Sequence, residues 1–227
     1  ESRLGLEAPP VTIYLSADEL AMRALAERHH GYAPPSWSGG LAFARSRQVY
    51  LPAQSPRELH ALLRHELAHI AIGAHAAPHR IPLWVNEGVA VALGEGLSLD
   101  RVRTLNEAAT LGELSSFSSL ERHFPEHGRP AQVAYAQSGH MISYITQRAG
   151  SLAFQRWLSA VCAGDSPLKA SIKHLPDPLP IYEREWRASL ERGLLARLGL
   201  LMKSETLWSL ALLIFIVMGM RRLRLRR

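Results

Sequence analysis

Hydrophobic residues follow a strand-like pattern early in the chain and a helical pattern after it. Val11–Leu15 is rich in β-branched and aromatic residues, and Leu41–Arg45 and Gln48–Leu51 are two further short runs that suit a hairpin or edge arrangement, so we expect three strands. Apolar residues then recur at helical spacing, and helices are expected over residues 55–72, 82–94, 136–149, 152–163 and about 181–198. This order predicts an α+β fold, with a small N-terminal mixed sheet packed on the first long helix and a helical C-terminal subdomain.

Short polar motifs predict where two of the helices begin. Ser16–Glu19 and Ser55–Glu58 are S-x-x-E patterns, in which the serine caps the helix and the glutamate returns a hydrogen bond. The first pattern predicts a helix that runs to about His30. The second is followed by Pro56, which suits a first helical position, and Gly73 is expected to end that helix.

The C-terminal end carries an apolar run followed by basic residues. Leu207–Met220 holds 14 residues of which one is polar, and a helix of that length spans about 21 Å, less than the ~30 Å hydrocarbon core of a bilayer. Arginines that snorkel to the surface can extend the span. A buried helix is the alternative, but five arginines at its end argue against burial. The predicted divisions are therefore a domain over 1–200, a linker over 201–206, a transmembrane anchor over 207–220 and a basic tail over 221–227.

The composition limits which partners and which metal ligands the chain can have. The net charge is +6, and the last seven residues contribute five arginines, so the rest is close to neutral and no nucleic-acid-binding surface is indicated. Cys162 is the single cysteine, which excludes an internal disulfide and a cysteine zinc cage. Eleven histidines are present, so a metal site would use histidine and carboxylate ligands.

The strongest motif is H-E-x-x-H, formed by His65, Glu66 and His69. Residues i and i+4 share one face of a helix, so both imidazoles can reach one zinc ion. Glu66 is placed to take a proton from water without being a ligand. A third ligand is needed, and Glu87 on the next predicted helix follows His69 by 18 residues, with room for a turn between the two helices.

Together these motifs resemble the gluzincin zinc metallopeptidases, such as the thermolysin and aminopeptidase N families. The similarity is greatest to bacterial peptidase MA-like domain proteins and covers residues 10 to 195. It also includes a W-x-x-G-x-A segment at Trp37–Ala42, an N-E-G-x-A helix at Asn86–Ala90 and a Y-A-Q-S helix start at Tyr135–Ser138.

The resemblance implies roles for these residues. His65, His69 and Glu87 would bind one zinc ion per chain, and Glu66 would be the general base. Tyr135 matches the tyrosine that hydrogen-bonds the tetrahedral oxyanion in related aminopeptidases. Leu41–Arg45 resembles the edge strand that pairs with the substrate backbone. No G-A-M-E-N segment is present to grip a free N-terminus, which favours an endopeptidase over an aminopeptidase.

The sequence therefore predicts a membrane-anchored zinc peptidase acting on peptides or proteins. The alternative is a catalytically silent zinc-containing module that binds a peptide or protein partner in the cell envelope, although such a module has no need of Glu66. A motif that arose by chance in an envelope protein is the third interpretation. The positive-inside rule places Arg221–Arg227 in the cytoplasm and residues 1–205 on the extracytoplasmic, periplasmic side of a single-pass cell-membrane protein. The oligomeric state has no signal in the sequence.

Overall fold

A computed structural model describes residues 4–7, 9–32, 39–94, 96 and 98–202 of the chain. It contains two compact units, Glu1–Trp186 and Arg187–Arg227. Helix α9 (Leu179–Met202) begins in the first unit and supplies the described part of the second. The predicted membrane segment Leu207–Met220 and the basic tail lie outside the described residues. Among those that are described, no helix combines the length and apolar character needed to cross a bilayer.

The predicted mixed sheet is confirmed in the described chain. Strands β1 (Thr12–Ser16), β2 (Leu41–Phe43) and β3 (Gln48–Pro52) form a three-stranded sheet in the order β1-β3-β2. β1 runs parallel to β3, whereas β2 pairs with β3 antiparallel. β2 is therefore an edge strand of the sheet, as the resemblance of Leu41–Arg45 to a substrate-pairing edge strand implied.

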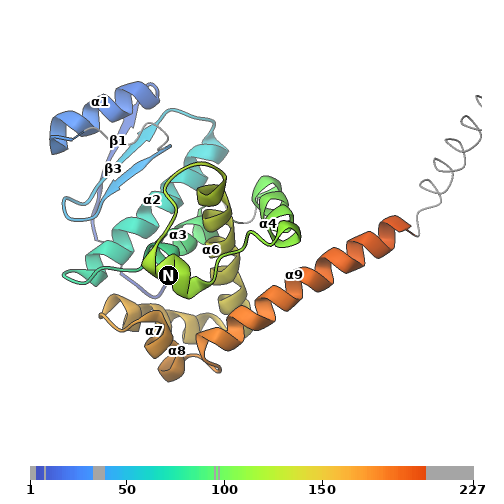
Figure 1. Cartoon of the computed structure of the whole chain (residues 1–227). Helices are drawn as coiled ribbons and strands as arrows, with labels where there is room; N and C mark the ends of the chain where they lie inside the picture. Colours follow the sequence, from blue (N-terminus) through green and yellow to red (C-terminus); the bar gives the residue numbers. More distant parts are fainter. Residues whose placement is uncertain (1–3, 8, 33–38, 95, 97, 203–227) are drawn as a thin grey trace, which may run out of the picture. The chain divides into compact units, whose positions relative to one another are not determined.

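Helices cover both faces of this sheet. Helix α1 (Glu19–His30) lies on one face and α2 (Pro56–Ala76) on the other (Figure 1). Successive side chains of a strand point to opposite faces, so Tyr50 of β3 packs with the α1 side while Val49 packs with the α2 side. The sheet thus fixes the position of α2, the helix that carries the H-E-x-x-H motif.

The two predicted capping boxes have different outcomes. At the start of α2, Ser55 and Glu58 form the reciprocal box, with Pro56 in the first turn. The box predicted at Ser16 is wrong, because Ser16 ends β1 and its carbonyl accepts a hydrogen bond from the Ala53 amide at 2.8 Å. Asp18 caps α1 instead, and its side chain accepts from the Ala21 amide at 2.7 Å.

Gly73 does not end α2, which continues to Ala76. A Cβ atom at Gly73 would collide with the Cβ of Ala44, just beyond β2. The glycine therefore allows the helix and the sheet edge to approach each other closely. In the sequence alone, a glycine needed for close packing cannot be told from one that ends a helix. α2 is longer than predicted because nothing at residue 73 interrupts its hydrogen bonding.

The rest of the described first unit is helical. Its helices are α3 (Leu83–Leu93), α4 (Leu99–Leu111), α5 (Phe117–Arg122), α6 (Gly128–Ala149), α7 (Ser151–Cys162), α8 (Pro167–His174) and the start of α9. α6 starts earlier than predicted, and α8 was not predicted. Trp84, Trp157 and Trp186 are fully buried among these helices.

α3 packs closely against both α2 and α6. At Gly88 a Cβ atom would come within 2.8 Å of the Ser138 carbonyl oxygen on α6. Any residue with a side chain would clash there, so only glycine fits. This close packing fixes the position of Glu87, the residue before Gly88.

Candidate functional site

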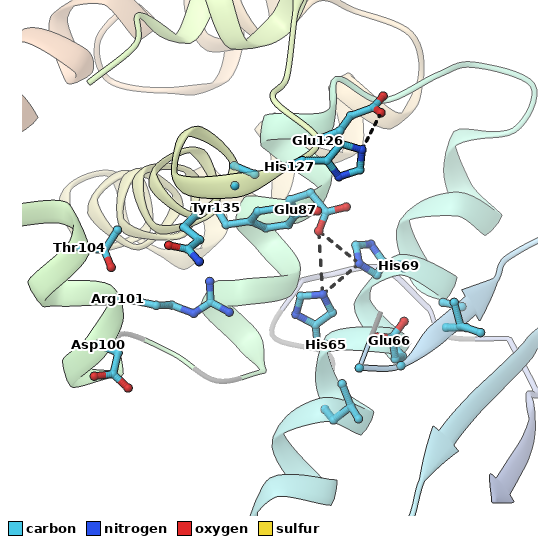
Figure 2. Close-up of a pocket in the computed structure, with 18 residues that line it drawn as sticks. His65, Glu66, His69, Glu87, Asp100, Arg101, Thr104, Glu126, His127 and Tyr135 are labelled. Atoms are coloured by element: carbon cyan, nitrogen blue, oxygen red, sulfur yellow. Dashed lines mark hydrogen bonds and ion pairs between the residues drawn. The ribbon is translucent and has the colours of Figure 1, made fainter. Parts of the chain in front are cut away.

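Three side chains from α2 and α3 converge on one point (Figure 2). The Nε2 atoms of His65 and His69 lie 3.2 Å apart. The Oε2 atom of Glu87 lies 3.9 Å from the first of these nitrogens and 3.6 Å from the second. The structure therefore brings together the three residues that the sequence predicted as metal ligands.

These separations fit a tetrahedral zinc site. Bonds of about 2.0–2.2 Å at tetrahedral angles put neighbouring ligand atoms roughly 3.3–3.6 Å apart. The three ligand atoms lie within 4.8 Å of one another, and the shortest separation joins two imidazole nitrogens that each offer a lone pair when neutral. Two nitrogens and one oxygen at these distances can hold one zinc ion and leave a fourth position open.

The protonation of the two ligand side chains is set largely by burial. Burial, together with the positive charges of His69 and Arg101, lowers the pKa of His65 to about 3. His65 is therefore neutral near pH 7, as a metal ligand must be. Burial raises the pKa of Glu87 from its ordinary value, and the charges of His69 and Arg101 oppose that rise.

A polar contact orients one of the two imidazoles. The Nδ1–H group of His69 donates to Oδ1 of Asn86 at 3.1 Å, which leaves Nε2 free to face the triad. Such partners fix the tautomer and the ring orientation of a metal-binding histidine. His65 Nδ1 is buried without a hydrogen-bond partner among the described residues. Sequence reasoning missed Asn86, although it directly precedes Glu87 in the N-E-G motif.

Glu66 is a buried carboxylate that is not part of the triad. Its exposed fraction is 5%, and burial raises its pKa to about 7, with His69 opposing and Glu87 assisting the rise. It lines the same cavity as the triad. A carboxylate with a pKa near neutrality beside an open metal position can accept and return a proton.

The start of β2 limits where the Glu66 carboxylate can lie. A Cβ atom at Gly40 would come within 2.7 Å of Oε1 of Glu66 and 3.0 Å of a methyl group of Leu62. At the neighbouring Gly39, a Cβ atom would meet nothing within 4 Å. Gly40 therefore leaves the space that the carboxylate occupies.

Tyr135 reaches the same cavity from α6 and extends toward Glu87 (Figure 2). Its ring packs edge-on against Phe124, with the centroids 5.3 Å apart. Burial and the charge of Glu87 raise its pKa well above the ordinary value, so the hydroxyl stays protonated and can donate a hydrogen bond. The prediction that Tyr135 begins a helix is wrong, because α6 starts at Gly128 and the tyrosine lies inside it.

The cavity has a volume of about 870 Å³, and its lining includes residues of β2, α2, α3, α4 and α6. Leu41 and Ala42 of the edge strand β2 form one wall, and α4 and α6 supply the other. Trp37 and Ser38, from the W-x-x-G-x-A segment, lie outside the described residues. The cavity is large enough for several residues of an extended peptide.

His127 also lines this cavity, whereas His75 and His140 do not. His75 belongs to the last turn of α2, where its Nδ1–H donates to the Ala71 carbonyl at 2.9 Å. His140 accepts a hydrogen bond at Nδ1 from the Trp186 indole at 2.7 Å. Both imidazoles serve the packing of the fold.

Comparison with known proteins agrees with this geometry. A family model, the Peptidase MA superfamily, matches residues 5–190. The chain belongs to the Peptidase MA superfamily. Comparisons with curated proteins and with solved structures gave no match. Membership identifies residues 5–190 as a zinc-peptidase-like domain, and the His65, His69 and Glu87 triad is the place in the described domain of this Peptidase MA superfamily member where a metal ion fits.

Replacing Asn86 by alanine should weaken zinc binding, because His69 loses the acceptor that fixes its tautomer. We expect a loss of about 10- to 100-fold in affinity, measured by competition with a fluorescent chelator. Asn86→Asp keeps an acceptor and should retain most of the affinity. Asn106→Ala, on α4 and outside the cavity, is the matched control. Equal affinity in Asn86→Ala and Asn106→Ala would remove the orienting role of Asn86.

Proposed function

We propose that this protein is a zinc-dependent peptidase, that it is an endopeptidase rather than an aminopeptidase, and that it is anchored in the cell membrane. The observation that carries the proposal is the buried Glu66 carboxylate beside three converging ligand atoms. A metal site that serves structure alone is closed by its ligands and has no use for a second, non-ligating carboxylate in the same cavity.

The chain's residues can perform hydrolysis without a covalent intermediate. Zinc held by His65, His69 and Glu87 would polarise the scissile carbonyl and lower the pKa of water. Glu66 accepts the proton that the attacking water loses and delivers it to the departing amine nitrogen. Tyr135 donates a hydrogen bond to the oxygen on which negative charge develops.

Substrate binding is proposed along β2. Its outer edge pairs with no other strand in the described chain, and an extended peptide can add to such an edge through backbone hydrogen bonds. Leu41 and Ala42 line the cavity that holds the triad, so a peptide on this edge would pass the reaction centre. The cavity has a volume of about 870 Å³, which is enough to hold residues before and after the scissile bond, as an endopeptidase requires.

Glu66→Gln tests the proposed function. The amide keeps the size of the side chain and loses the base, so we expect zinc binding to persist while kcat falls by about 100-fold or more. The measurement is cleavage of a fluorogenic peptide library by the zinc-loaded chain. Normal turnover in Glu66→Gln would disprove the mechanism, and a wild-type chain that binds peptides without cleaving them would favour the silent binding module.

Tyr135→Phe should lower kcat by about 10-fold or more with little change in KM, because the lost hydrogen bond forms mainly in the transition state. Tyr144→Phe is the matched control, since Tyr144 is on the same helix but packs against Tyr182 outside the cavity. If both variants kept wild-type kcat, Tyr135 would have no part in the reaction.

Gly40→Ala should displace the Glu66 carboxylate, because the new methyl group would occupy the space beside Oε1. We expect a fall in kcat of about 10-fold or more with zinc affinity unchanged, since the loss of a 1 Å placement is costly to catalysis. Gly39→Ala adds the same methyl group in open space and should leave kcat unchanged. Equal kcat in the two variants would mean that Gly40 does not position Glu66.

The membrane anchor is supported by the sequence of Leu207–Met220 and the arginines that follow it. The positive-inside rule puts these arginines in the cytoplasm and the peptidase domain on the periplasmic side. Protease added to intact spheroplasts that express the full chain should digest the domain and spare a small tail fragment. Full protection of residues 1–205 would overturn this topology, and release of the chain by high salt alone would overturn the anchor.

A further inference from the structure

The edge of the sheet away from the triad carries exposed apolar side chains. Helix α2 packs on β2 and β3, whereas β1 packs on β3 and α1. In β3, Val49 and Leu51 face α2. Ile13 and Leu15 lie beside them in β1 and so point to the same side of the sheet, yet their exposed fractions are 46% and 61%. The face of β1 on the α2 side is therefore uncovered.

The backbone of β1 also has a free side. Within the described chain, β1 pairs with β3 alone. The Thr12 amide donates to the Arg47 carbonyl at 2.9 Å, toward β3. Because successive residues of a parallel strand turn their backbone groups to opposite sides, the N–H and C=O groups of Ile13 and Leu15 point outward. This edge can accept a further strand.

The flank of α2 next to this edge is hollowed. Its groove has a volume of about 580 Å³ and is lined by Pro56, Arg57, His60, Leu63, Arg64 and Leu67. Leu62 and Glu66 of α2 face the start of β2, where Gly40 lies against both. The groove positions recur at helical spacing on another flank of the helix. Because the strand order is β1-β3-β2, that flank lies toward β1.

The groove and β1 also match in direction and length. Only residues 53–55 separate β3 from α2, so α2 turns back and runs antiparallel to β3 and β1. From Pro56 to Leu67 the helix advances by about 16 Å, and a strand of five residues such as β1 covers a similar distance, roughly 16 Å. The groove therefore follows β1 from its end toward its beginning.

The arginines of this groove have no carboxylate partner in the part of the chain that the structure describes. Arg64 donates to the Gly94 carbonyl at 3.1 Å, which leaves its charge unneutralised. Glu58, the nearest carboxylate to Arg57 in the sequence, accepts from the Ser55 amide in the capping box. Two uncompensated positive charges beside exposed apolar side chains complement a ligand that is both acidic and apolar.

From these features we propose that β1 and the grooved flank of α2 dock an extended acidic segment of a partner protein, which adds to the sheet as a fourth strand. The backbone of that segment pairs with the outward groups of Ile13 and Leu15. Its apolar side chains cover the exposed face of β1, and its carboxylates pair with Arg57 and Arg64. The proposal is independent of the peptidase function, because the groove and Glu66 are on different flanks of α2.

The chain itself does not supply a matching occupant. Residues 203–227 carry six lysine and arginine side chains and one acid, Glu205, so their charge has the same sign as that of the groove. A second copy that paired its β1 antiparallel to this one would place its α2 on the same face of the joined sheet. Arg57 and Arg64 of the two copies would then face each other, and like charges repel. A separate acidic partner meets neither obstacle.

The experiment measures the binding of designed peptides to the full chain in detergent micelles, with Glu66→Gln present so that no peptide is cleaved. The probes are fluorescein-labelled ten-residue peptides in which threonine alternates with valine or glutamate. By fluorescence anisotropy, we expect the glutamate peptide to bind about 10-fold or more tighter than its glutamine analogue. N-methylation of one alternate set of amides should abolish binding while methylation of the other set should not, because only one set faces β1.

Variants assign the site to α2. Arg57→Gln should bring the affinities of the glutamate and glutamine peptides to within about twofold of each other, and Arg57→Glu should invert the preference. Arg28→Gln is the matched control, because Arg28 is an exposed arginine in the last turn of α1, which covers the other face of the sheet. A peptide held in the cavity of the triad would not respond to Arg57→Gln.

Three outcomes would overturn the proposal. The first is a glutamate preference that survives in Arg57→Gln. The second is equal binding of the two N-methylated peptides, which would show that no strand is added. The third is the absence of peptide binding, and a dimer in sedimentation that Leu15→Asp dissociates would then assign this edge to a second copy of the chain. Loss of peptidase activity in the wild type would contradict the proposed function and leave these binding results as they are.

Discussion

The contact between α2 and α3 is the constraint on which the rest of the site depends. Two histidines on one helix supply two nitrogens, but a zinc site requires a third ligand from elsewhere in the fold. Close packing of α3, which Gly88 permits against α6, carries the Glu87 carboxylate to 3.6 Å from His69 Nε2. A shift of α3 by one residue would move Glu87 to another face of its helix and leave two ligands.

This arrangement concentrates charge in a place that water does not reach easily. Glu66 is buried and Glu87 is largely buried, and the loss of contact with water raises the pKa of each, because removing a carboxylate from water penalises its charged form. A divalent cation between the ligands would offset this cost for Glu87. The same burial raises the pKa of Glu66 to about 7, so that its carboxyl group can exchange protons near neutral pH. One packing arrangement thus favours metal binding and gives Glu66 the pKa that its proposed role as the base requires.

Much of this could be predicted from local sequence. Helical periodicity alone places the two histidines of H-E-x-x-H on one face of a helix. The Ser55 cap and Pro56 mark the start of that helix, α2. Features that depend on distant contacts were missed or misassigned. Gly73 was expected to end α2, but the glycine is needed because Ala44 lies against it. Asn86 has no local signal as a partner of His69, since that hydrogen bond depends on how two helices cross.

The most direct test of this account is the zinc affinity of the full chain, measured by reloading the stripped protein with zinc against a competing chelator. The account predicts one zinc per chain in the wild type, and a large loss of affinity in Glu87→Gln. Glu126→Gln, which removes a charge from the same cavity but from outside the triad, should bind zinc as the wild type does. A wild type without zinc, or a Glu87→Gln variant with undiminished affinity, would contradict it.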